Sequence, residues 1–114
     1  MRKALDKVRS TKTMTEGQIR SWIFLATAMA SQTQPADYDS ISSIADGINH
    51  AVPTHKELQT SLTWLTKNDL VSKTGSKYRL TEKGLFNYET ASRQTSTLLK
   101  IWDNLETVLK KYGT

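Results

Sequence analysis

Lysine and arginine side chains crowd one short stretch of the chain, "KNDLVSKTGSKYRLTEKG", which covers residues 67–84. Lys73, Lys77 and Arg79 surround a Gly-Ser pair that lies between two short runs containing apolar residues. Ammonium and guanidinium groups bind phosphate oxygens, and each such contact with a nucleic acid releases counterions. The stretch therefore predicts either a phosphate-binding hairpin or a hairpin tip that is simply well solvated.

Positive charge is unevenly distributed along the 114 residues, which carry a formal net charge of +5. Residues 2–13 hold five Lys and Arg against one Asp, and residues 55–81 hold five against two acidic residues. Residues 14–54 hold one Arg against four acidic residues. This segregation is typical of a surface that meets a polyanion. A protein-binding face usually carries apolar and aromatic anchors instead.

The polar residues that precede the hairpin are of types that read base edges. Leu58, Leu62 and Leu65 define one side of a helix, and polar side chains fill the other side. Gln bonds adenine, Thr contacts a base edge or a thymine methyl, and Lys reaches guanine or phosphate. We expect Gln59 and Thr60 to read the DNA sequence. The predicted DNA-binding residues are Thr54, His55, Lys56, Gln59, Thr60, Thr63, Lys67, Lys73, Lys77 and Arg79.

Catalytic and metal chemistry find little support in the sequence. The two histidines, His50 and His55, fit no helical metal spacing, and there is no cysteine. The five glycines are scattered and form no phosphate loop. We therefore expect a protein that is not an enzyme and binds no cofactor or metal. The longest apolar run, residues 22–30, is too short to span a bilayer, so we expect no membrane partner.

Helix signals precede the leucine-rich segment. Thr15 and Gln18 have the spacing of a capping box, which predicts a first helix over about residues 16–31. Residues 31–39 are predicted to be a loop, and Ser40 can cap a second, shorter helix. That helix is expected to present Ile41, Ile44, Ala45 and Ile48 to the core.

The next elements complete a helix-turn-helix order. Residues 50–53 interrupt the second helix, and Thr54 with Glu57 forms another capping box. The third helix is expected to stop near Asn68–Asp69 because either residue tolerates a left-handed conformation. Tyr78 and Leu80 then alternate with cations, as in a strand, and Gly75-Ser76 supplies the turn.

A long final helix is predicted from Glu82, capped by Thr81, to about Tyr112. The apolar spacing in its second half is that of a heptad seam. A helix of about 30 residues would be about 45 Å long, more than a core this small can cover. We therefore expect a homodimer whose interface is formed by Leu98, Trp102, Leu105, Leu109 and Tyr112.

The segment "HKELQTSLTWLTKNDLVSKTGSKYRLTEKG" resembles the recognition helix and wing of small dimeric regulators related to the PadR and MarR families. "YRLTEKG", residues 78–84, is the most recognisable part, and the similarity extends over about residues 16–90. Those families usually have Gly before the first wing strand, where this chain has Asp69. The resemblance implies an α+β, mostly helical fold: a winged helix-turn-helix with a two-stranded wing and a long C-terminal dimerisation helix.

Together these observations predict three regions: a basic arm over residues 1–14, a winged helix-turn-helix domain over 15–82, and a dimerisation helix over 83–114. The predicted function is sequence-specific binding of double-stranded DNA by a homodimer, as a cytoplasmic, nucleoid-associated transcriptional regulator. The recognition helix, about residues 55–68, would enter the major groove, and the wing, residues 70–81, would lie on the backbone or minor groove.

Several alternatives stay open at this point. The protein could serve plasmid or phage partition or replication, or its winged helix could bind another protein. The basic arm could clamp the DNA backbone or only increase solubility. The resemblance also implies that a pocket beside the dimer helix could hold a small apolar effector. Trp64, on the flank of the third helix, is expected to pack under another helix or at the dimer interface rather than on a base.

Overall fold

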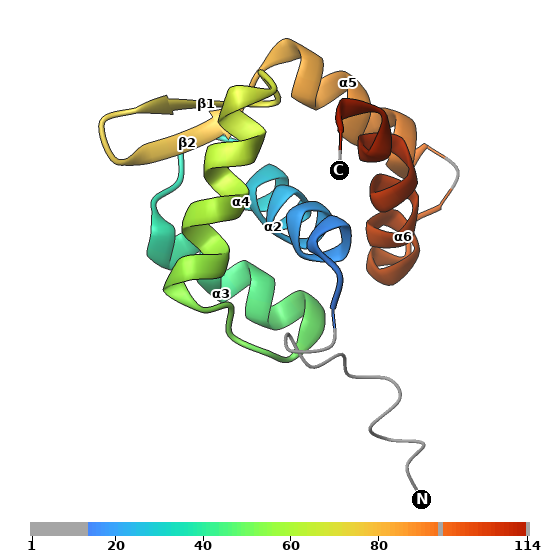
Figure 1. The fold of residues 1–114 in the computed structure, drawn as a ribbon, viewed down its shortest axis with the longest axis horizontal. Helices are drawn as coiled ribbons and strands as arrows, with labels where there is room; N and C mark the ends of the chain where they lie inside the picture. The colour runs from blue at the N-terminus through green and yellow to red at the C-terminus, as the bar shows by residue number, and fades with distance from the viewer. Residues whose placement is uncertain (1–13, 94, 114) are drawn as a thin grey trace, which may run out of the picture.

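The computed structural model describes residues 14–93 and 95–113, so the predicted basic arm lies outside the described residues except for Met14. Its fold is α+β and mostly helical. In chain order the elements are α2 (Glu16–Ala30), α3 (Tyr38–Asn49), α4 (His55–Lys67), β1 (Val71–Thr74), β2 (Lys77–Leu80), α5 (Glu82–Ser92), α6 (Leu98–Leu109) and a short 3₁₀ helix (Lys110–Tyr112). The hairpin β1–β2 projects from one side of the helices, and α5 and α6 lie on the other (Figure 1).

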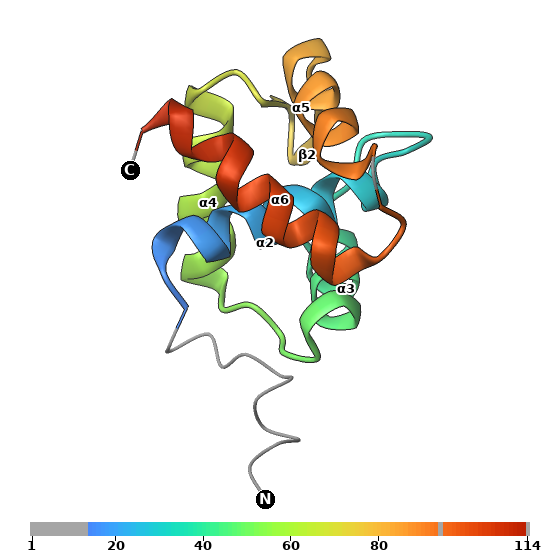
Figure 2. The same ribbon diagram turned by 90° about the vertical axis from the view of Figure 1, so that its right-hand side faces the viewer.

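Helix α2 is the centre of the core. The predicted capping box is present, because the Thr15 hydroxyl accepts from the Gln18 amide and the Gln18 side chain accepts from the Thr15 amide. All residues from Ser21 to Ala28 are buried, because α3, α4 and α6 all pack against α2. Figure 2 shows α6 lying across α2.

Two tryptophans tie the other helices to α2. The Trp22 indole donates to the carbonyl of Ala45 in α3 at 2.9 Å, and the Trp102 indole of α6 donates to the carbonyl of Gln18 at 2.9 Å. Their rings stack with centroids 6.1 Å apart. Each buried indole N–H therefore has an acceptor, as buried polar groups require.

Helix α3 begins earlier than predicted. Its N-cap is Asp37, whose carboxylate accepts from the Ser40 amide at 2.9 Å, so Ser40 lies inside the helix. An Asp carboxylate caps a helix as well as a Ser hydroxyl does, so the sequence offers two possible N-caps. The predicted loop, residues 31–39, wrongly includes Asp37. Of the four predicted core residues Ile41, Ala45 and Ile48 are buried, and Ile44 is half-buried.

Helix α4 follows the sequence signals closely. Thr54 and Glu57 form the predicted capping box, and Leu58, Leu62 and Leu65 are buried. The helix ends at Lys67, and Asp69 adopts the left-handed conformation, with a φ of 62°. Asp tolerates this conformation better than most residues.

The hairpin pairs Val71 with Leu80 and Lys73 with Tyr78, and Gly75, with a φ of 63°, lies in its turn. One contact was not predicted. Ala36, within the segment expected to be loop, exchanges two backbone hydrogen bonds of 2.8 Å with Tyr78. The segment before α3 therefore pairs with β2 through an isolated β-bridge, which connects the hairpin to the helices.

The C-terminal prediction is wrong: the segment expected to form one long helix forms two. α5 ends at Ser92, and after a connection α6 runs back to pack against both α2 and α5. Trp102, Leu105 and Leu109 are buried inside their own chain, with exposed fractions of 2%, 0% and 4%. The heptad spacing is the core face of a short helix, and these three residues have no surface left for a second chain.

The base of the hairpin is tied to both neighbouring helices. The Thr81 hydroxyl accepts from the Gly84 amide at 2.9 Å, which caps α5, and donates to the carbonyl of Asp69 at 2.6 Å. The Thr81 amide donates to the carbonyl of Leu70. These bonds explain physically why a Leu-Thr-x-x-Gly sequence ends the hairpin.

Candidate nucleic-acid interface

The outer side of α4 is fully available. Its predicted site residues Thr54, His55, Lys56, Gln59, Thr60, Thr63 and Lys67 are all exposed. Two hydroxyls are already engaged: Thr54 caps the helix, and Thr60 donates to the carbonyl of Lys56 at 2.9 Å. Gln59 and Thr63 have no such local bond among the described residues, so they are the freest of the polar side chains.

A hollow of about 390 Å³ joins α4 to the hairpin. Its lining includes Thr63, Thr66 and Lys67 from α4 and Lys73 from β1, so cations from two elements border the same depression. Thr66 is exposed and was missing from the predicted site, although its position one turn after Thr63 could have indicated it.

The three hairpin cations do not share a face. Residues directly opposite in an antiparallel pair point to the same side, so Lys73 lies with Tyr78. The Lys73 ammonium is 5.8 Å from the centre of the Tyr78 ring. Lys77 and Arg79 are on the opposite face, and Arg79 borders a different hollow beside α5. The predicted single cluster is therefore split, and only Lys73 adjoins α4.

Aromatic side chains fix the geometry between α3, α4 and the hairpin. The Tyr38 ring lies 5.4 Å from His55, edge to face, and 5.9 Å from Tyr78, stacked. Burial raises the pKa of the Tyr38 phenol, and Tyr78 raises it further. No local sequence pattern indicates this contact, because the three rings come from distant segments.

Carboxylates border the hairpin side of the surface. Asp37 and Asp39 line a shallow hollow with Lys73. Hydrogen bonds from Ser40 lower the pKa of Asp37, and Lys77 lowers it to a smaller extent. The acidic start of α3 therefore limits how far the positive surface extends from α4.

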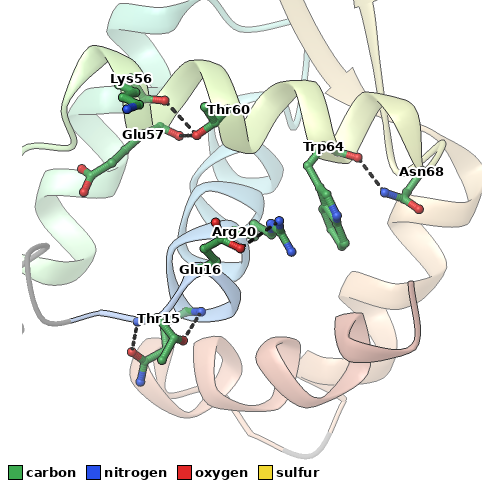
Figure 3. A network of polar contacts seen from close by, with 9 residues as sticks. Thr15, Glu16, Arg20, Lys56, Glu57, Thr60, Trp64 and Asn68 are labelled. Atoms are coloured by element: carbon green, nitrogen blue, oxygen red, sulfur yellow. Dashed lines mark hydrogen bonds and ion pairs between the residues drawn. The ribbon is translucent and has the colours of Figure 1, made fainter. Parts of the chain in front are cut away.

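Trp64 lies on the other side of α4, away from the hairpin. Figure 3 shows it extending from α4 towards Arg20 of α2, and the Arg20 guanidinium carbon is 4.5 Å from the centre of its ring. Trp64 is half-buried, as expected of a residue that packs against a neighbouring helix rather than a base.

Residues 14–93 and 95–113 contain neither a metal-binding cluster nor a membrane-spanning helix. No group of three or more His, Asp or Glu residues there could hold a metal ion. Within the same residues no helix has the length and apolarity needed to cross a membrane.

Comparisons with protein-family models, with curated proteins and with solved structures found no match to this chain.

Proposed function

We propose that this protein is a winged helix-turn-helix protein that binds double-stranded DNA sequence-specifically and regulates transcription. Helix α4 would lie in the major groove, with Gln59 and Thr63 at base edges. Lys67 and Lys73 would contact the phosphate backbone beside it. Lys77 and Arg79, on the other face of the hairpin, would meet a phosphate strand across the minor groove.

The observation that carries the proposal is the hollow shared by α4 and β1. It brings two ammonium groups, Lys67 and Lys73, next to exposed threonine hydroxyls on a helix whose outer side has no large apolar residue. The element order supports the winged-helix part of the proposal. Helix α2 is followed by a segment in which Ala36 pairs with Tyr78, then by α3, α4 and the hairpin.

A homodimer is part of the proposal, but through contacts other than the predicted seam. Helix α5 exposes the adjacent residues Leu85 and Phe86, by 47% and 61%. Leu85 also borders a hollow of about 260 Å³, which is lined by Leu80 and Tyr88 and by the polar residues Ser31, Gln32 and Arg79. A recess of mixed polarity therefore lies next to an apolar projection. A two-fold dimer formed by this face would predict DNA half-sites about 10 bp apart.

The test compares two double variants with the same change in charge. Lys67→Ala/Lys73→Ala should weaken binding to a mixed-sequence duplex and reduce the slope of log affinity against log salt by about 2, because each phosphate contact contributes about 0.9. Arg93→Ala/Lys100→Ala removes two exposed cations, one directly after α5 and one in the first turn of α6, and should leave the slope unchanged. Helix α6 lies on the other side of the molecule from the hairpin (Figure 1). Fluorescence anisotropy over a salt series measures both.

Equal losses from the two double variants would mean that net charge rather than this surface drives binding. Selection of bound duplexes from a random pool then tests specificity. An enriched palindrome supports a dimeric regulator, and a pool that stays random contradicts sequence-specific reading.

A further inference from the structure

A second hollow lies behind α4, on the side away from the proposed DNA surface. Its volume is about 400 Å³, which is within the range of small-molecule sites. It is formed by the first turns of α2, by Trp64 of α4, by Glu106 and Leu109 at the end of α6, and by Lys110 and Gly113 of the segment that follows α6. The Trp64 indole and Leu109 make part of its wall apolar, and the rest of the wall includes charged side chains.

Arg20 supplies unused hydrogen-bond donors to this hollow. Its side chain is only 18% exposed, and its one ion pair among the described residues is with Glu16, at 3.4 Å. The Glu16 side chain is 81% exposed, so this pair is screened by solvent and contributes little. A guanidinium has five N–H donors, and the Arg20 guanidinium carbon lies 4.5 Å from the centre of the Trp64 ring. A carboxylate placed in the hollow could therefore be bound by two parallel hydrogen bonds.

Glu106 supplies the opposite charge from α6. It is half-buried, and its side chain has no hydrogen bond or ion pair within the described parts of the chain. It packs close to the first turn of α2: a Cβ atom added to Gly17 would lie 3.9 Å from its Cγ and 4.0 Å from its Oε2. The hollow thus has a guanidinium from one helix and a carboxylate from another.

We propose that this hollow binds a free α-amino acid with an apolar side chain. The ligand carboxylate would pair with Arg20, its ammonium group with Glu106, and its side chain would lie against Trp64 and Leu109. The lining carries two cations, Arg20 and Lys110, and two carboxylates, Glu16 and Glu106, so a simple anion would find no net positive charge there. An uncharged apolar molecule would leave the Arg20 donors unused. A zwitterion satisfies both charges at once.

The experiment uses the full chain without DNA, so its result is independent of the proposed function. Isothermal titration with the twenty L-amino acids, each to 10 mM, should find binding by apolar members such as leucine or phenylalanine. For leucine, the matched probes are 4-methylpentanoate, which lacks the ammonium group, and 3-methylbutylamine, which lacks the carboxylate. Each should bind at least about tenfold more weakly, since one charge-assisted interaction is lost.

Variants locate the site. Arg20→Gln and Glu106→Gln should each weaken binding about tenfold or more, and Arg20→Lys, which keeps the charge but loses the planar fork, should be intermediate. Arg93→Gln and Glu89→Gln make the same changes at exposed positions elsewhere and should leave affinity unchanged. Circular dichroism verifies that each variant is folded. Absence of binding by all twenty amino acids overturns the proposal, as does equal binding of either single-charge analogue.

Discussion

Gly84 illustrates how one residue can fix the angle between the hairpin and the helix that follows. A Cβ at this position would overlap the backbone carbonyl of Leu70, and it would also press on the Leu80 side chain. The overlap is with backbone, which cannot rotate away as a side chain can. The close approach of α5 to the end of α4 is therefore possible only with glycine at this position.

Replacing Gly84 with alanine should accordingly destabilise the protein by about 3 kcal/mol, because the helix must move away from Leu70. The control is Gly47→Ala in α3, where an added Cβ meets nothing within 4 Å. That variant should gain up to about 1 kcal/mol, since alanine is the better helix former. Urea denaturation measures both. A Gly84→Ala protein as stable as wild type would mean that the junction is not constrained as described.

At the level of elements, the two C-terminal helices are held by burial rather than by a partner chain. Leu105 is in the middle of the heptad seam that was predicted to form the dimer interface. It is completely buried between α6 and the rest of the core. A carboxylate in its place would lose its hydration without gaining a partner.

Leu105→Glu should therefore unfold the protein or destabilise it by more than about 4 kcal/mol, instead of giving a folded monomer. Leu99→Glu is the matched control, because Leu99 is 51% exposed on the same helix and its replacement should change stability by less than about 0.5 kcal/mol. Thermal unfolding followed by circular dichroism distinguishes them. A well-folded Leu105→Glu variant would indicate that α6 does not pack on α2 in solution.

Local signals made α2, α4 and the hairpin predictable from sequence. The capping boxes at Thr15 and Thr54 and the turn at Gly75 each depend on residues within four positions of one another. The exposed polar side of α4 was predictable for the same reason, since helical periodicity alone separates it from the leucines.

The features that were not predicted from sequence depend on contacts between distant segments. The break after Ser92 was missed because residues 93–97 contain neither Gly nor Pro and the apolar spacing continues beyond them. The split of Lys73 from Lys77 and Arg79 required the strand register, which the irregular first strand did not define. The two hollows beside α4 each combine residues from separate elements, so no local pattern could indicate them.

For the whole molecule, the arrangement of exposed surfaces suggests how two copies could combine. The positive outer side of α4 and the apolar residues of α5 lie on different elements, joined through the hairpin base at Thr81. A dimer formed through α5 would therefore leave α4 of each copy free for DNA and would set the distance between the two recognition helices.

This arrangement predicts that Leu85→Glu/Phe86→Glu is monomeric at concentrations where the wild-type protein is dimeric, because each copy would lose an apolar projection and the recess beside it would remain unfilled. Leu98→Glu/Leu99→Glu introduces the same charges at the exposed start of α6 and should remain dimeric. Sedimentation equilibrium from 1 to 100 μM compares the three proteins. If the α6 variant is the one that dissociates, the interface lies at the start of α6. If the wild-type protein is monomeric throughout, DNA binding as a preformed dimer is contradicted, and an enriched palindrome would then require assembly on the DNA itself.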